Sequence, residues 1–307
     1  MIDPAVSAAS FCKNHVLIQE LRAIYPEAKL NESGRVLQNE ELIQFLTGFE
    51  AAIVGTEQIT DAILAALPDL KFIAKYGVGL DNLDQRALEN RGIGLGWTGG
   101  VNCRSVSEMA LAFMIGLCRN LFVTSQKLHH GEWDKRGGVQ LSGKTVGIIG
   151  CGHVGSDLLE LLQPFRCNIL ICDILDKSDL CLRTGARQVE QRELLALSDL
   201  VTLHVPLTDV TRNMVDADFL AQMQSHAFLI NTSRGAVVKE EDLEMALQSG
   251  TLAGAALDVF QIEPPTNASF LALPNLICTP HIGGNSMEAV LAMGRSAISH
   301  IKSWRDF

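Results

Sequence analysis

Three residues in the second half of the chain have side chains suited to acid–base chemistry on a small anion: Arg234, Glu263 and His281. The planar guanidinium of Arg234 can bind a carboxylate through two parallel hydrogen bonds. Histidine is the side chain best suited to exchanging a proton near pH 7. A carboxylate beside the imidazole, here Glu263, would fix its tautomer and favour its charged form.

A glycine-rich turn adds a nucleotide site to this set. The predicted strand Thr145–Ile149 runs into Gly150-Cys151-Gly152-His153-Val154-Gly155, where a helix is predicted to begin at His153. In such a G-x-G-x-x-G turn the first glycine makes the turn, the second lets backbone amides approach a pyrophosphate, and the third lets the helix pack closely on the sheet. A purely structural turn is the alternative, but the strand before it and the helix after it favour dinucleotide binding.

Asp173 points to the kind of dinucleotide, because it follows the next predicted strand, Asn168–Cys172. Its carboxylate can accept hydrogen bonds from two ribose hydroxyls but would repel a 2′-phosphate. The three residues after it include no arginine to bind that phosphate. The predicted cofactor is therefore NAD, although Asp173 could instead cap a helix or lie in a solvated turn.

These residues and the cofactor would meet the needs of hydride transfer between a 2-hydroxy acid and a 2-keto acid, the reaction that the family resemblance described below implies. Arg234 would bind the substrate carboxylate and carbonyl oxygen. His281 would donate a proton to the new alkoxide in reduction and accept it from the hydroxyl in oxidation. No C-x-x-C pair occurs in the chain, and no metal site is predicted.

Short apolar runs alternate with helical patterns along the 307 residues, which predicts an α/β fold. We expect two doubly wound parallel-sheet domains with a cleft between them. The first is a flavodoxin-like substrate-binding domain of residues 1–98 and 285–307, which is discontinuous because a final helix from Ser286 to about Trp304 returns to it. The second is a Rossmann NAD-binding domain of residues 99–284.

Five motifs, in order along nearly the whole chain, resemble the D-isomer-specific 2-hydroxyacid dehydrogenase family, especially its phosphoglycerate dehydrogenase-like branch. They are Tyr76–Asn82, Gly150–Gly155, Asn231–Gly235, Leu257–Pro264 and Pro280–Gly284. The resemblance assigns to Arg234, Glu263 and His281 the same roles as the chemistry does. It also implies a dehydrogenase that binds NAD.

The resemblance implies substrate contacts at four further positions. Val78 and Gly79 match a loop whose backbone amides hold the substrate carboxylate, and Asn102 matches a cleft residue at the domain junction. Lys75 stands where some phosphoglycerate enzymes carry a phosphate-binding arginine, but Gly55 and Thr56 replace a second basic residue expected nearby. Lys75 could therefore serve 3-phosphoglycerate, a plain carboxylate or no ligand, and the substrate stays open.

Further cofactor contacts are implied by the same resemblance. Asp258 matches the acid that binds the nicotinamide carboxamide, while Pro206 and Thr211 match residues that line the cofactor cleft. His204 matches a strand end near the cofactor, and a structural role is an equal alternative.

Composition restricts the partners. A net charge of −10 would repel nucleic acid and anionic membrane surfaces, so a small-molecule substrate is expected. Residues 1–10 contain no basic segment and no apolar run is long enough to span a bilayer, which predicts a cytoplasmic protein. One long amphipathic helix is predicted over Ser105–Leu121, and with Trp133 it matches the segment that family members wrap around a partner, so a homodimer is expected.

A second class of function remains open, namely a non-catalytic NAD-sensing interaction protein built on the same fold. The presence of Arg234, Glu263 and His281 together argues against lost chemistry. A formate-type enzyme is disfavoured, because that branch of the family carries glutamine in place of Glu263.

Overall fold

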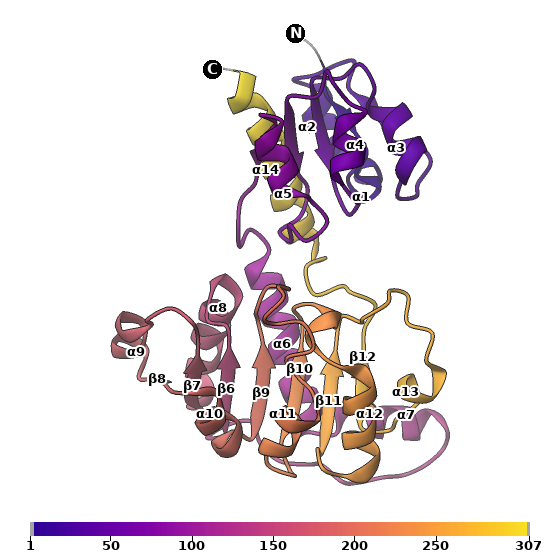
Figure 1. Cartoon of the computed structure of the whole chain (residues 1–307). Helices are drawn as coiled ribbons and strands as arrows, with labels where there is room; N and C mark the ends of the chain where they lie inside the picture. The colour runs from indigo at the N-terminus through magenta and orange to yellow at the C-terminus, as the bar shows by residue number, and fades with distance from the viewer. Residues whose placement is uncertain (1–2, 306–307) are drawn as a thin grey trace. The chain divides into compact units, whose positions relative to one another are not determined.

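The computed structural model describes residues 3–305 and divides into two compact units (Figure 1). Unit 1 is the chain up to Asn102 together with the chain from Asn285 onward, and unit 2 is Cys103–Gly284. The sequence placed this junction after Thr98, whereas the units divide after Asn102. Residues 1–2 and 306–307 of the predicted first domain lie outside the described residues.

Unit 1 contains a parallel five-stranded sheet in the order β2-β1-β3-β4-β5. Its strands are β1 (Ala5–Val6), β2 (Lys29–Leu30), β3 (Ala51–Val54), β4 (Phe72–Lys75) and β5 (Gly94–Gly96). Its helices are α1 (Ala9–Cys12), α2 (His15–Arg22), α3 (Asn39–Leu46), α4 (Asp61–Ala65), α5 (Gln85–Asn90) and α14 (Met287–Arg305). This strand order is the flavodoxin-like one, as predicted.

Helices cover both faces of this sheet. Successive strand residues point to opposite faces, so each strand packs against both groups of helices. In β3, Ala52 and Val54 pack against α3, α4 and α5, whereas Ala51 and Ile53 pack against α1, α2 and α14. A Cβ at Gly294 of α14 would lie 2.3 Å from a methyl group of Leu17 in α2, so glycine allows these two helices to approach closely. The C-terminal helix therefore completes unit 1, as the sequence predicted.

Unit 2 contains a parallel seven-stranded sheet in the order β12-β11-β10-β9-β6-β7-β8, which is the Rossmann order. Its strands are β6 (Thr145–Ile149), β7 (Asn168–Cys172), β8 (Arg187–Gln188), β9 (Leu200–Leu203), β10 (Phe228–Asn231), β11 (Gly254–Leu257) and β12 (Leu276–Cys278). Its α-helices are α6 (Cys103–Cys118), α7 (Leu121–His129), α8 (His153–Leu162), α9 (Ser178–Thr184), α10 (Gln191–Leu197), α11 (Ala217–Gln222), α12 (Glu240–Ser249) and α13 (Ala268–Leu271). Short 3₁₀ helices occupy Gln163–Phe165 and Gly235–Val237. The predicted α/β fold with two doubly wound parallel sheets is confirmed.

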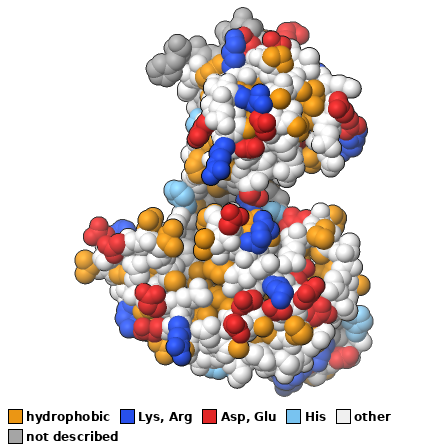
Figure 2. Space-filling view, in the orientation of Figure 1, with side chains coloured by type: hydrophobic (Ala, Val, Ile, Leu, Met, Phe, Trp, Pro, Cys, Tyr) orange, Lys and Arg blue, Asp and Glu red, His pale blue; other side chains and the backbone are white. Residues whose placement is uncertain are grey.

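The long helix predicted over Ser105–Leu121 is α6, which ends at Cys118, three residues before the predicted end, and α7 follows from Leu121 after a bend of 67°. The break falls at Asn120, whose φ of +51° lies in the left-handed region that ends a helix. Within residues 3–305, no single helix is long and apolar enough to cross a membrane, and only this bent pair reaches the required length and composition. Figure 2 shows acidic and basic side chains interspersed over the visible face of each unit.

Candidate active site

His281 and Glu263 form a hydrogen-bonded pair in unit 2. His281 follows β12 and Glu263 lies in the loop after β11, and the imidazole Nδ1 is 2.7 Å from Glu263 Oε2. The other oxygen of Glu263 accepts a hydrogen bond from the Phe260 amide at 3.1 Å. The carboxylate is therefore held by its own loop while it orients the imidazole.

The pair changes the acidity of both partners. The hydrogen bond from Glu263 raises the pKa of His281 above its ordinary value, although burial acts in the opposite direction. Burial raises the pKa of Glu263, but the hydrogen bonds from His281 and the Phe260 amide outweigh it, so the Glu263 pKa lies below its ordinary value. Histidine is thereby favoured as imidazolium and glutamate as carboxylate.

Asp258 fixes the backbone that carries His281. Its carboxylate is 1% exposed and accepts hydrogen bonds from Thr279 Oγ1 at 2.6 Å, the Ile282 amide at 2.8 Å and the Gly283 amide at 2.7 Å. The Asp258 carbonyl accepts from the His281 amide at 2.8 Å, and His281 itself adopts a left-handed φ of +53°. These bonds hold a left-handed backbone conformation that is uncommon for residues other than glycine.

Arg234 belongs to the same group of loops. It follows β10, where the side chain of Asn231 binds the Arg234 carbonyl and both the amide and the hydroxyl of Ser233. A Cβ on the next residue, Gly235, would lie 1.9 Å from the carbonyl carbon of Phe260, so this loop rests directly on the one that carries Glu263. The charge of Arg234 adds to the lowering of the Glu263 pKa and opposes the rise of the His281 pKa. Unit 2 thus brings the three predicted catalytic residues together.

The glycine-rich turn has the geometry that its pattern predicts. Gly150 has a φ of +85°, and a Cβ there would lie 2.7 Å from the His204 carbonyl oxygen, while a Cβ on Gly155 would lie 2.4 Å from the Gly150 oxygen. A Cβ on Gly152 would meet nothing within 4 Å, and His153 and Val154 open the first turn of α8. A cavity of about 440 Å³ is lined by Gly152 and His153. This room and the backbone amides at the N-terminus of α8 fit a dinucleotide pyrophosphate.

Asp173 lies beside this turn and is already engaged by the protein. Its Oδ2 accepts from the Cys151 amide at 2.6 Å and its Oδ1 from the Leu175 amide at 2.8 Å. Lys177 Nζ lies 3.6 Å from Oδ2. Lys177 is not among the predicted cofactor residues, although its position four residues after the acid, directly before α9, was a signal for it.

Pro206 and Thr211, which the family resemblance assigns to the cofactor cleft, lie in a compact loop after β9. Thr211 Oγ1 donates to the Pro206 carbonyl at 2.6 Å and accepts from the Thr208 amide at 2.8 Å. His204 Nε2 lies 2.9 Å from Thr202 Oγ1, and burial lowers the pKa of this imidazole to about 3. His204 is therefore neutral, and a structural role suits it at least as well as a cofactor contact.

The remaining predicted residues belong to unit 1. Val78 and Gly79 are half-buried, and the Val78 carbonyl accepts from the Trp97 indole at 2.8 Å. Asn102 is half-buried at the end of the unit. Lys75 is 5% exposed, and its ammonium donates to the Gly55 carbonyl and, at 2.6 Å, to Asn82 Oδ1. Among the described residues, no group of three or more His, Cys, Asp or Glu could hold a metal ion.

Comparison with known families agrees with this geometry. Residues 111–283 match the model of the D-isomer specific 2-hydroxyacid dehydrogenase, NAD binding domain. A hydroxypyruvate reductase of Thermotoga maritima is 32% identical over 280 residues, which cover 89% of this chain and 90% of the relative. A D-3-phosphoglycerate dehydrogenase of Methanocaldococcus jannaschii is 35% identical over 283 residues, but the match covers only 54% of that longer protein.

The fold is also similar to solved structures. One is an NADPH-dependent glyoxylate/hydroxypyruvate reductase of Sinorhizobium meliloti in complex with NADP and malonate. It superposes with a TM-score of 0.83 at 27% identity, over 98% of this chain and 93% of that one. The relatives therefore include enzymes named for phosphorylated and for unphosphorylated substrates.

Proposed function

The chain belongs to the D-isomer specific 2-hydroxyacid dehydrogenase family, and on that premise we propose how its own residues carry out the reaction. It is an oxidoreductase that uses a nicotinamide cofactor. We assign His281 as the acid/base, Glu263 as its partner and Arg234 as the cation that binds the substrate. The reaction interconverts a D-2-hydroxy acid and its 2-keto acid.

In reduction, a hydride adds to C2 of the keto acid, and the carbonyl oxygen becomes an alkoxide that needs a proton. His281 donates that proton from Nε2 as imidazolium, which forms the hydroxyl and leaves a neutral ring. In oxidation, the same nitrogen accepts the hydroxyl proton as the hydride leaves C2. Arg234 binds the carboxylate and stabilises the charge on the oxygen. The bound nicotinamide supplies the hydride in one direction and takes it in the other.

One observation carries this assignment, namely the 2.7 Å contact between His281 Nδ1 and Glu263 Oε2. A hydrogen bond at Nδ1 leaves proton exchange with the substrate to Nε2. The raised pKa of His281 also keeps a larger share of the proton-donating form at neutral pH. The hydrogen bond to Glu263 thus both orients the imidazole and favours its proton-donating form.

The test is a screen of 2-keto acids in which NADH absorbance reports the reaction. The substrates include glyoxylate, hydroxypyruvate, phosphohydroxypyruvate and 2-ketoglutarate. His281→Ala should lower kcat by about 10² to 10⁴ for each substrate that is used, with NADH affinity by calorimetry little changed. His15→Ala, an exposed histidine at the start of α2, is the matched control and should retain activity. Binding of NADH without reduction of any 2-keto acid would refute the proposal.

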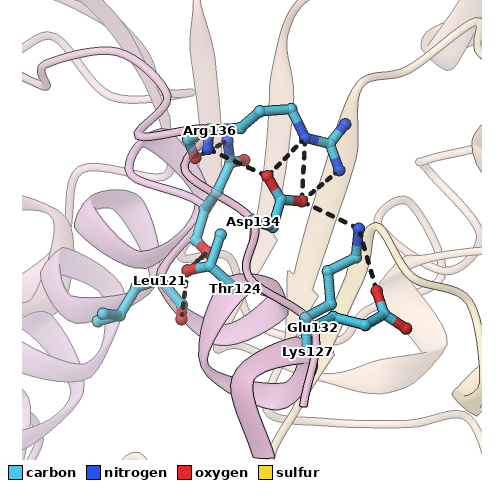
Figure 3. A network of polar contacts seen from close by, with 7 residues as sticks. Leu121, Thr124, Lys127, Glu132, Asp134 and Arg136 are labelled. Carbon is cyan, nitrogen blue, oxygen red and sulfur yellow. Dashed lines mark hydrogen bonds and ion pairs between the residues drawn. The ribbon is translucent and has the colours of Figure 1, made fainter. Parts of the chain in front are cut away.

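We also propose that the chain forms a homodimer through α7 and the segment after it. Large apolar side chains are exposed there, among them Trp133 at 78%, Leu128 at 56% and Leu121 at 54%. Figure 3 shows how this segment is braced, since Asp134 accepts from both Arg136 and Lys127. Side chains of this size on a fixed backbone suit burial against a second copy.

Light scattering tests the dimer. The unmodified protein should have the mass of two chains, and Leu128→Ser with Trp133→Ser should shift it to one. Ile174→Ser is the control, because Ile174 is a fully exposed apolar residue elsewhere in unit 2. A single-chain mass for the unmodified protein would contradict the proposal.

A further inference from the structure

The loop that carries Glu263, residues 260–266, has a buried start and an exposed middle. The side chain of Phe260 packs in the same apolar core as Val237 and Val238, whereas residues 261–264 are exposed. In the part of the chain that the structure describes, only Gln261 and Glu263 among residues 261–266 make hydrogen bonds. The position of Glu263 therefore depends on how Gln261 is held.

Gln261 is tied to the start of α12 through both its backbone and its side chain. Its amide donates to Glu240 Oε1 at 2.5 Å, and its side chain donates to the Val238 carbonyl at 2.8 Å and to Asn213 Oδ1 at 3.3 Å. A carboxylate makes a stronger bond to an amide than a neutral acceptor does, so Glu240 supplies the strongest of these ties. Burial raises the pKa of Glu240, and the bond from the Gln261 amide opposes that rise.

The segment that binds Gln261 also carries Arg234. A short 3₁₀ helix links Arg234 to α12, which begins at Glu240. A Cβ on Gly235 would lie 1.9 Å from the Phe260 carbonyl carbon and 2.5 Å from the Gln261 nitrogen, so the two segments are in direct contact at the backbone. Contact at Gly235 limits how closely the loop can approach, and the bond to Glu240 keeps it from moving away.

Three acids begin α12, and they differ in what they contact. Glu240 binds the Gln261 amide, and Asp242 accepts from the first amide of α11 at 2.9 Å. Glu241 is exposed. All three are favoured at a helix N-terminus, where the helix dipole stabilises negative charge. The dipole therefore does not distinguish Glu240 from Glu241, whereas the contact with the loop does.

We propose that Glu240 is a positioning residue that holds Glu263 within hydrogen-bond distance of His281. It acts through the Gln261 amide, and the inference rests on the proposed function, in which Glu263 is the partner of His281. Without this bond the exposed part of the loop is free to move away from α12. Glu263 then loses the contact that orients the imidazole.

The experiment measures reduction of the 2-keto acid that the screen finds to react fastest, across a range of pH. Glu240→Ala removes the acceptor, and kcat should fall by about tenfold or more, because displacing a catalytic group by about 1 Å can cost roughly 100-fold. KM should change by less than about threefold, since the Arg234 loop is held separately by Asn231. The rate should also begin to fall at a lower pH, because His281 loses the bond that raises its pKa.

Two controls separate the hydrogen bond from charge and from helix stability. Glu240→Gln removes the charge but keeps an oxygen that can accept from the Gln261 amide, so its kcat should stay within about threefold and its pH profile in place. Glu241→Ala removes an exposed acid from the same helical turn and should match the unmodified protein. A pH profile that moves as far in Glu240→Gln as in Glu240→Ala would trace the effect to charge and overturn the inference.

A double variant tests whether Glu240 acts through Glu263. Residues in one network have non-additive effects, whereas the effects of independent residues add. Glu263→Gln by itself should already move the reductive profile to lower pH, so adding Glu240→Ala should move it no further. Additive shifts would overturn the inference, since Glu240 would then act on His281 by another route.

The inference and the proposed function fail in different ways. An unchanged pH profile in folded Glu240→Ala overturns the inference and leaves the proposed function intact, whereas reduction of no 2-keto acid by the unmodified protein overturns both. If Glu240→Ala fails to fold, Glu240→Asp keeps the charge at the helix start but withdraws the carboxylate by one methylene, and it should shift the profile in the same direction. Loss of the fold in both variants, or an unchanged profile in Glu240→Asp, overturns the inference.

Discussion

Asp258 in unit 2 and Glu57 in unit 1 are both buried carboxylates near the carboxyl edge of a parallel sheet, and each is 1% exposed. Asp258 receives hydrogen bonds from three groups of one loop, Thr279, Ile282 and Gly283. Glu57 receives one, from the Gly55 amide, and one of its oxygens has no hydrogen-bond partner in the described part of the chain. The same chemical group thus accepts three hydrogen bonds in one unit and one in the other.

This difference separates two uses of a buried acid. A carboxylate with many backbone donors fixes the conformation of the loop that supplies them. A carboxylate with few donors mainly sets the local charge. Removal of the negative charge should therefore disturb the loop geometry more at Asp258 than at Glu57.

Asp258→Asn should have the larger effect. The new amide group points a donor at loop amides that are themselves donors, so the backbone of His281 must move. A displacement of a catalytic group by about 1 Å can cost roughly 100-fold in rate. We expect kcat to fall by about that factor for every 2-keto acid, with NADH affinity changed by less than about threefold. Steady-state kinetics and calorimetry measure the two quantities.

The control is Asp199→Asn, which alters a partly buried acid near the amino end of the same sheet, where Asp199 accepts from the Thr145 amide. This variant should lose stability but keep kcat within about threefold. If Asp258→Asn weakens NADH binding as much as it lowers kcat, the acid serves the nicotinamide carboxamide, as the family resemblance implies. The contrast with Glu57 would then concern ligand contact instead of loop geometry.

Glu263 combines both uses, since it accepts from a backbone amide and sets the charge beside His281. Glu263→Gln keeps a hydrogen-bond partner but removes the charge that raises the pKa of His281. Reduction needs the protonated ring, so its rate falls as pH rises through this pKa, while the oxidative rate rises. Both limbs should move to lower pH by a similar amount. Rate profiles in the two directions measure this shift.

Glu241→Gln is the control for this measurement, because Glu241 is an exposed acid on α12 in the same unit. Its pH profiles should match those of the unmodified protein. Solvent isotope effects should first establish that proton transfer limits the rate. If it does and the Glu263→Gln limbs stay in place, another group sets the His281 pKa and the pair must be reassigned.

The sequence predicted those parts of the site that depend on local chain geometry. The roles of Gly150 and Gly155 could be predicted because the motif places glycine where any side chain would clash with the backbone. The residues Arg234, Glu263 and His281 could be grouped because each follows a strand, and strand ends of a parallel sheet meet at one edge.

Features that depend on tertiary packing could not be predicted from the sequence. The predicted helix extends to Leu121, three residues past the end of α6, because its apolar spacing gave no sign of the left-handed backbone at Asn120. Lys75 looked like a ligand-binding cation because its internal partners, Gly55 and Asn82, are distant in sequence or lie in a loop. The burial of Glu57 could not be predicted from hydrophobic periodicity, because the residue lies outside helices and strands.

Asp173, at the predicted cofactor site, is an acid with both backbone donors and a nearby cation. It can therefore be compared with Asp258, which is held by donors. Two backbone amides, of Cys151 and Leu175, hold its oxygens, and Lys177 lies 3.6 Å away. The predicted preference for NAD rests on repulsion between Asp173 and a 2′-phosphate. Lys177 would attract the same phosphate, but in this arrangement it is paired with the acid.

Asp173→Ala should have the smallest of the three effects. The variant removes the repulsive charge and leaves Lys177 without its partner, so kcat/KM for NADPH should rise relative to NADH by up to about tenfold. Adding Lys177→Met should remove most of that gain, because an uncharged side chain offers the phosphate nothing. Melting temperatures with and without NADH would show whether losing the acceptor of the Cys151 amide disturbs the turn itself. Equal use of both cofactors by the unmodified protein would show that the donors around Asp173, and not its charge, determine its role.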